Sequence, residues 1–264
     1  MDNSNSFLSI RYGKIVNNNN KNVLLRGVNL GGWIMMEGYI LYGRNIPEKS
    51  FRFNLEKIYG KKKASSFTQA FRSFFITEDD FKRISDIGFN CVRIPFNFRL
   101  IEDDKNPFKY NEEGIEFLEK VFGWCEQYKI YCILDMHAAP GSQNKDWHSD
   151  SHGESYLWSK KIYQKRFFRL WEFIANRFKD RSIIAGYNVL NEPVIKKAPR
   201  NTLRNFYKET VKYIRKVDKN HIIFLEGNFW SRVLEDIGEP FADNLCYSVH
   251  YYDPLDFTHN FHKG

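Results

Sequence analysis

Cysteine is scarce in this sequence, with four residues among 264: Cys91, Cys125, Cys132 and Cys246. All four lie inside apolar strand or helix patterns, and none belongs to a CxxC pair or to a Cys/His spacing typical of metal sites. We therefore expect buried free thiols and a reducing compartment.

Long apolar runs are also missing. No stretch is long enough to cross a bilayer, so we expect no membrane span. The segment from Met1 to Ser9 is polar and lacks the basic, apolar and small-residue regions of a signal peptide. These features favour the cytoplasm, and export stays open if translation starts at another site. Nothing in the composition indicates an oligomeric state.

The sequence has no excess of acidic residues, since 40 Lys and Arg against 32 Asp and Glu give a net charge of +8. Such a balance raises nucleic acid and anionic membrane surfaces as partners. Apart from Lys61 to Lys63, however, basic residues alternate with acids along expected helices, as between Lys160 and Glu172. This distribution predicts a solvated outer face and no nucleic-acid partner. Binding to DNA or RNA with a steep salt dependence is the alternative that charge alone suggests.

Aromatic residues, by contrast, are abundant, at 17% of the chain within a hydrophobic content of 42%. The length and this content suit one domain, 1–264, around one sizeable core. Several aromatic residues lie in polar, Gly-containing stretches, where a core does not need them. They indicate a cleft that stacks on sugars or bases.

A strand-then-helix rhythm follows an expected N-terminal hairpin, in which Asn17 to Asn22 joins the runs Phe7 to Val16 and Val23 to Leu25. The expected strands are Leu24 to Leu30, Phe89 to Pro95, Ile130 to Asp135, Ile183 to Leu190, His221 to Leu225 and Asn244 to Val249. The expected helices are one from a Thr77/Asp80 capping box to Gly88, Glu112 to Gln127, Lys160 to Phe178, Thr202 to Val217, and a short one from Ser231.

Continuous apolar strands predict a parallel sheet that is covered on both faces. Polar residues follow nearly every strand: Asn29, Arg93, His137, Asn191 with Glu192, Glu226, and His250 with Tyr252. An open doubly wound sheet gathers its ligand groups at one switch point, whereas a (β/α)8 barrel collects them from all strand ends. The sequence therefore predicts a (β/α)8 TIM barrel, incomplete in this chain at about six of eight βα units.

Glu192 lies in the tripeptide Asn191-Glu192-Pro193, directly after an apolar strand that Pro193 cannot continue. A carboxyl group at that mouth, walled by strands and aromatic rings, would hold its proton near neutral pH, as a general acid must. From these three residues alone, Glu192 could equally be a carboxylate that caps a helix or lies in a loop. The polar residues at the other strand ends favour the interpretation as a general acid.

These motifs resemble glycoside hydrolase family 5, the cellulase family, across nearly the whole chain. The motifs are Arg26-Gly-Val-Asn-Leu-Gly-Gly-Trp33, Val92-Arg93-Ile94-Pro95, Asp135 to Asn144 (DMHAAPGSQN), Asn191-Glu192-Pro193 and His250-Tyr251-Tyr252. The Leu-Gly-Gly-Trp and Ala-Pro-Gly-Ser-Gln-Asn segments are most similar to the exo-β-1,3-glucanase-like branch.

The resemblance implies a retaining hydrolase of β-glucosidic bonds in a β-glucan or related β-glycoside, without a cofactor, that uses two glutamates. It implies that Glu192 is the acid/base and that Asn191 binds the sugar 2-hydroxyl. Arg93 would hold the nucleophile ionised, and His137, His250 and Tyr252 would line the same subsite. For each of these residues alone, an ion pair, a core histidine or a packing residue is the alternative.

Further residues are expected to contact the glycan. Glu37 and Glu226 follow strands and are expected to bond hydroxyls, as is Asn144; the candidates for ring stacking are Trp33, Trp147, Trp158 and Trp230. The His and Asp residues between Asp135 and His152 also suggest a metal site. They match no familiar zinc spacing, so a long loop over the cleft, Gly141 to Ser155, is the preferred reading, with no metal.

The resemblance places the nucleophile on a seventh strand, which this sequence does not contain. Residues Leu255 to Gly264 read as the loop after strand six. We therefore expect this chain to be a catalytic barrel domain that is truncated at its C-terminus and inactive at this length. We expect the complete protein to be an active hydrolase. A carbohydrate-binding pseudoenzyme is the alternative.

Overall fold

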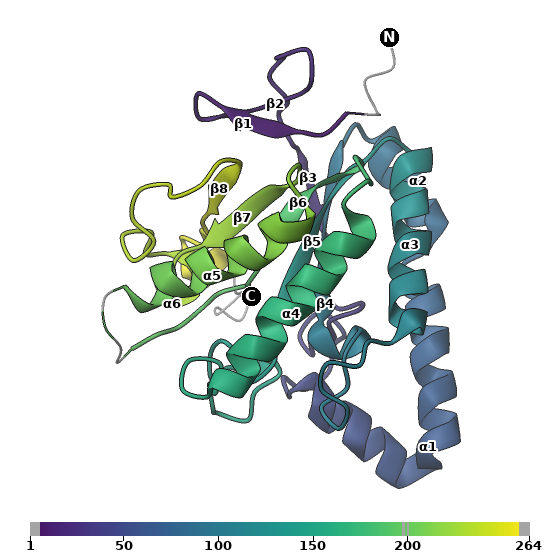
Figure 1. Ribbon diagram of the computed structural model, residues 1–264. Helices are drawn as coiled ribbons and strands as arrows, with labels where there is room; N and C mark the ends of the chain where they lie inside the picture. Colours follow the sequence, from purple (N-terminus) through teal and green to yellow (C-terminus); the bar gives the residue numbers. More distant parts are fainter. Residues whose placement is uncertain (1–5, 197–198, 200, 259–264) are drawn as a thin grey trace.

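The computed structural model describes residues 6–196, 199 and 201–258 (Figure 1). Its strands are β1 (Ser9–Arg11), β2 (Lys14–Val16), β3 (Gly27–Asn29), β4 (Cys91–Asn97), β5 (Tyr131–Ala138), β6 (Ile184–Asn188), β7 (Ile222–Glu226) and β8 (Leu245–Ser248). Its helices are α1 (Glu48–Phe74), α2 (Glu78–Asp86), α3 (Glu112–Gln127), α4 (Lys161–Phe178), α5 (Thr202–Val217), α6 (Asn228–Ser231) and α7 (Leu255–Thr258), with 3-10 turns at Phe98–Leu100 and Trp147–Ser149.

Six parallel strands form one sheet in the order β3-β4-β5-β6-β7-β8, which is also their order in the chain. Helices α2, α3, α4 and α5 lie along the outside of this curved sheet (Figure 1). Each strand pairs in parallel with the next one in the chain. The helix that connects two such strands packs on the outer side, as in a right-handed βα unit. This arrangement confirms the predicted partial (β/α)8 barrel.

Alternation along each strand builds two separate cores. In β5, Cys132 and Leu134 point outward into the large core shared with the helices. Tyr131 and Ile133 point inward, where they join a smaller cluster around Ala185. The inward positions further along β5 are Asp135 and His137. The inner face is therefore apolar at the start of the strands and polar at their ends.

The β1–β2 hairpin covers the apolar end of the inner face (Figure 1). Leu8 is 1% exposed and packs in the same cluster as Ile222 and Phe224. The N-terminal hairpin is confirmed, but its turn lies at Tyr12 and Gly13, both with positive φ, and not at the asparagine run. Asn17 to Asn22 forms a second tight turn that a single bridge, Val16 to Asn22, closes.

The main helices begin and end where local chemistry dictates. The Thr77/Asp80 capping box is present at the start of α2, and Gly88 follows its end with φ of 89°. Asn111 is the N-cap of helix α3, and its Oδ1 accepts a hydrogen bond from the Glu113 amide at 3.1 Å. The bounds of α3 and α5 match the predicted ones.

Three differences from the sequence-based expectations concern segments with weak periodicity. Helix α1 is not predicted by the sequence pattern; it bends at Gly60 (φ 79°) and has only two buried residues, so it carries no clear apolar stripe. The expected helix from Ser231 is wrong, because α6 ends at that residue. The segment expected to be the final loop contains α7, and its residues 259–264 lie outside the described part.

Two further sequence expectations concern thiols and membranes. Cys91, Cys125 and Cys132 are buried and free, and Cys246 is free and half-buried. Among the described residues, no helix combines the length and the apolar character that a bilayer span requires.

Candidate active site

Polar side chains from β4, β5, β6 and β7 meet at the carboxyl ends of these strands, around the guanidinium of Arg93. Arg93 donates hydrogen bonds to Asn188 at 2.8 and 2.9 Å, to Asn191 at 2.9 Å and to Glu226 at 3.1 Å. It also pairs with Asp135 at 2.9 Å. Burial opposes its charge, but these carboxylates raise the pKa of Arg93 above its ordinary value. Arg93 also donates to Asn29 of β3 at 3.1 Å, so the arginine stays charged and ties five strands together.

Glu192 has a left-handed backbone, with φ of 45°, directly before Pro193. A non-glycine residue seldom adopts this conformation without outside support. Here the amide of Glu192 donates to Glu226 Oε2 at 2.7 Å, and its carbonyl accepts a bond from Asn144 Nδ2 at 2.9 Å. Hydrogen bonds on both sides of the residue thus fix its direction at the strand end.

The carboxyl group of Glu192 is 12% exposed and lies between two histidines. Its Oε1 is 2.5 Å from His250 Nδ1, and its Oε2 is 3.5 Å from His148 Nε2. The carboxyl group is therefore partly open to solvent, and an imidazole faces each of its two oxygens.

Glu226 lies beneath Glu192 and is fully buried. Burial alone would raise the pKa of Glu226, but His250, Arg93 and the Glu192 amide lower it to about 2. Its carboxylate faces three protein donors, namely the Glu192 amide, Arg93 and His250, and the expectation that Glu226 bonds sugar hydroxyls stays a prediction. Its place is that of a support for Glu192.

His250, after β8, bridges the two glutamates. Its Nδ1 faces Glu192, and its Nε2 is 3.2 Å from Glu226 Oε1. Burial would lower the pKa of His250, yet hydrogen bonds to both carboxylates raise it to about 9. The histidine is therefore a cation at neutral pH.

A second histidine, His137 on β5, forms a parallel arrangement with Asp135 at 2.7 Å and Glu37 at 3.8 Å. Burial again opposes the charge, but both carboxylates raise the pKa of His137 to about 10. In return, despite its burial, the pKa of Glu37 lies below its ordinary value because of His137. Asn191 Nδ2 lies 3.4 Å from His137 Nε2, which links this group to the acid/base segment.

Two of the predicted tryptophans and Tyr252 border the cluster. Trp147 is half-buried beside Tyr39, with ring centroids 5.8 Å apart, and Trp230 donates to Asp146 at 2.7 Å. Tyr252 is partly exposed, with its ring 6.4 Å from His250.

The structure does not bring the other two tryptophans to the cluster. Trp33 is fully buried and donates to the Arg72 carbonyl at 2.8 Å. Trp158 packs against Phe206 and donates to the Gln143 carbonyl at 2.8 Å. Asn144 is also buried, and it supports the backbone of Glu192.

Sequence patterns assign no role in the cluster to three side chains: Asn188, Gln143 and His148. Asn188 could have been found from the sequence, because it is a polar residue at the end of an otherwise apolar strand, β6, where it is buried. Gln143 donates to the carbonyls of His137 and Asn191 at 2.7 and 2.9 Å. His148 comes from the loop after β5, and no sequence pattern places a loop side chain.

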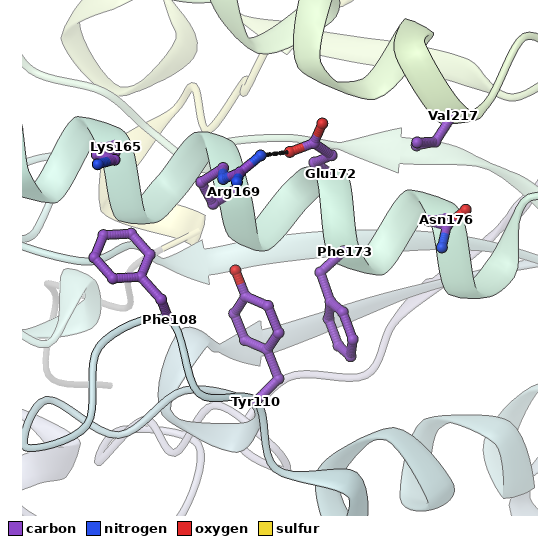
Figure 2. Close-up of a pocket in the computed structure, with 8 residues that line it drawn as sticks. All are labelled: Phe108, Tyr110, Lys165, Arg169, Glu172, Phe173, Asn176 and Val217. Carbon is purple, nitrogen blue, oxygen red and sulfur yellow. Dashed lines mark hydrogen bonds and ion pairs between the residues drawn. The ribbon is translucent and has the colours of Figure 1, made fainter.

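The structure bears on the metal reading, and it has a hollow that lies apart from this cluster. No group of three or more His, Cys, Asp or Glu residues in the described ranges is arranged to hold a metal ion. A hollow of about 490 Å³ opens on the outer side of the helices, where Phe108 and Tyr110 lie beside Phe173 and the polar side chains of α4 (Figure 2). None of its lining residues comes from a strand end.

Comparison with known proteins agrees with the geometry. Residues 48–263 match the model of the family described as Cellulase (glycosyl hydrolase family 5). A protein named Beta-xylosidase from Phanerodontia chrysosporium is 38% identical over 255 residues, 96% of this chain and 53% of that protein. Endoglucanase C from Acetivibrio thermocellus is 30% identical over 236 residues, 88% of this chain and 59% of that protein.

The chain thus spans little more than half the length of these curated relatives. Among solved structures, rutinosidase from Aspergillus niger superimposes with a TM-score of 0.69 at 18% identity, over 86% of this chain and 68% of that chain. At this identity the likeness concerns the fold alone.

Proposed function

The chain belongs to glycosyl hydrolase family 5, and from this premise we propose that the complete protein hydrolyses β-glycosidic bonds with retention of configuration. The observation that carries the proposal is the position of Glu192. Its carboxyl group is partly exposed at a strand end and lies between two imidazoles. Its backbone is left-handed and is held by hydrogen bonds at both its amide and its carbonyl. The expected substrate is a β-glucan or a related β-glycoside.

In this mechanism Glu192 acts twice. It first protonates the glycosidic oxygen as that bond breaks and a covalent glycosyl-enzyme forms. Its carboxylate then takes a proton from water, which attacks the same carbon and releases the sugar. Both steps require one carboxyl group at a fixed position, which the bonds from Asn144 and to Glu226 support.

We assign the nucleophile to a seventh strand, outside residues 1–264, so that this chain is the larger N-terminal part of one barrel domain. Glu226 is a poor candidate because three protein donors occupy its buried carboxylate. Arg93 and His250 would then supply positive charge next to the incoming nucleophile.

The remaining cluster residues take the contacts with the sugar. Asn191 would bind the 2-hydroxyl, and His137 with Glu37 would bind hydroxyls on the opposite side of the ring. Tyr252, Trp147 and Trp230 would supply apolar ring faces along the cleft. Asn144 acts through the backbone of Glu192.

The test is to express the complete reading frame, extended past the codon for Gly264, with Glu192→Gln beside it. Glu192→Gln should lower kcat/KM on laminarin roughly 100-fold to 10,000-fold, since the neutral amide cannot donate the proton. The loss on an aryl β-glucoside with a good leaving group should be smaller in the first step, because that group needs less acid assistance.

Glu209→Gln is the matched control, because Glu209 lies on α5 and pairs with Lys212 at 3.4 Å, away from the strand ends. It should leave both activities unchanged. A folded, complete protein that binds laminarin but turns over neither substrate would replace the hydrolase with the carbohydrate-binding pseudoenzyme.

A further inference from the structure

We propose that His148, on the loop after β5, is a positioning residue for the acid/base group: its imidazole Nε2 lies between the carboxylates of Glu192 and Asp146 and orients Oε2 of Glu192. The proposal rests on the proposed function of Glu192. It adds a second side chain to the control of the proton that Glu192 gives and takes back.

The geometry places His148 between two carboxylates. Its Nε2 lies 3.5 Å from Glu192 Oε2 and 3.6 Å from Asp146 Oδ2, and its side chain is 14% exposed. Its ring also contacts Trp147 edge-on, with centroids 5.6 Å apart. The imidazole is therefore enclosed, and it faces the one oxygen of Glu192 that His250 does not bind.

Asp146 is itself anchored from another strand end. Trp230, after β7, donates its indole N–H to Asp146 Oδ2 at 2.7 Å. The hydrogen bond with His148 lowers the pKa of Asp146 from its ordinary value. Both carboxylates face the same nitrogen, Nε2, so they favour the tautomer that carries its N–H there, and that N–H lies between them.

The loop that carries His148 is fixed at its far end. Asp150 is fully buried and accepts bonds from the Lys49 amide at 2.8 Å and from Asn97 Nδ2 at 2.9 Å, and it pairs with Arg99. It also has a left-handed backbone, with φ of 57°, which these bonds support. His148 thus belongs to a pinned segment and not to a freely moving loop tip.

The same loop also holds the main chain of Glu192. Asn144 donates to the Glu192 carbonyl at 2.9 Å, while its own Oδ1 accepts a bond from the Asp146 amide at 2.9 Å. One segment, from Asn144 to Ser149, therefore sets both the backbone and one carboxylate oxygen of the acid/base residue.

Other charges around the pair determine what His148 can add. The titratable and charged groups that face Glu192 or His148 are Arg93, Glu37, Tyr39, His137, Asp146, Glu226, His250 and Tyr252, with Lys196 beside Asp146. His250 divides its two N–H groups between Glu192 and Glu226. A donor at Oε2 stabilises the carboxylate further, so its loss should leave Glu192 protonated to a higher pH.

The experiment replaces His148 with phenylalanine in the complete protein, which keeps a ring against Trp147 and removes the donor. The alkaline limb of kcat/KM, which reports the protonated acid, should move up by about half a pH unit to one unit. His148→Gln, which retains an N–H donor, should restore part of the shift.

His152→Gln is the matched control on the same loop, since His152 bonds Ser50 at 2.9 Å and does not face Glu192. Its pH profile should stay that of the parent. A uniform loss of rate in His148→Phe with an unmoved limb would mean a merely structural role and would overturn the proposal.

A measurement without turnover separates this proposal from the proposed function. In protein labelled with ¹³C at the glutamate carboxyl groups, the signal absent from Glu192→Gln identifies Glu192. That signal should titrate at higher pH in His148→Phe than in the parent. If the complete protein is inert but the shift appears, the hydrolase proposal fails and the positioning role stands; an unshifted signal rejects the role.

Discussion

Single residues in the cluster illustrate how burial and charge act against each other. Burial opposes the ionisation of Glu226, His250 and His137, yet each is ionised because its partners carry the opposite charge. The result is a chain of alternating charges beneath the partly exposed carboxyl group of Glu192.

Glu226→Gln tests this chain of charges through stability. The folded pKa of Glu226 is about 2, below its ordinary value of 4.5, so its contribution is present above about pH 4.5 and is lost as the pH falls toward 2. Near pH 7 the variant should lose about 3 kcal/mol of unfolding free energy, because Arg93 and His250 lose an anionic partner. Urea denaturation of both proteins gives this difference.

Near pH 3 the difference in unfolding free energy between the two proteins should be smaller, because the stabilisation by the ionised Glu226 decreases as the pH falls toward its folded pKa. Glu239→Gln, at an exposed residue, is the control and should change the unfolding free energy by less than about 0.5 kcal/mol. An equal gap at both pH values would mean that Glu226 is not the ionised support described above.

At the scale of elements, the inner face of the sheet depends on the β1–β2 hairpin. The inward side chains at the strand starts would meet water without it, since Leu8, Ile10 and Ile15 cover them. The hairpin has only three residue pairs of its own, so packing and not pairing holds it in place.

Leu8→Ala should therefore lower the unfolding free energy by about 2 to 5 kcal/mol, through lost burial and the cavity left against Ile222 and Phe224. Leu24→Ala removes the same atoms from a side chain that is 65% exposed and should cost less than about 0.5 kcal/mol. Thermal and urea unfolding of the two variants measure the contrast. Equal effects would mean that the hairpin does not seal this end of the sheet.

At the scale of the whole molecule, the sheet has two edges, β3 and β8, each paired on one side only. Apolar residues after β8 are exposed, with Val249 at 58%, Tyr251 at 79% and Phe257 at 84%. An unpaired strand beside exposed apolar side chains is a template for association.

We expect the 264-residue chain to associate at micromolar concentrations and above. Val249→Lys should reduce that association, because a charged residue next to the edge opposes strand addition. Ile58→Lys, on the exposed side of α1, serves as the control and should have no effect. Light scattering after size-exclusion chromatography measures the mass; a monomer at all concentrations would contradict the prediction.

The order of strands and helices and the places of the strand-end residues could be predicted from the amino-acid sequence alone. Apolar runs, caps and the positions of Arg93, His137 and Glu192 are local signals, and local signals can be recognised without knowledge of the fold. The same reasoning failed where the pattern was weak, as in α1, where few side chains are buried.

Tertiary packing was needed to distinguish the partly exposed carboxyl group at one strand end from the buried one at the next. Glu226 and Glu192 look alike in sequence, as carboxylates after neighbouring strands, but one is fully buried and the other is partly exposed. The reason is that Glu226 points inward along its strand, whereas Glu192 lies beyond the end of its own strand with a left-handed backbone. His148 reaches the cluster through a loop anchored at Asp150, and distant anchors of that kind leave no periodic trace in a sequence.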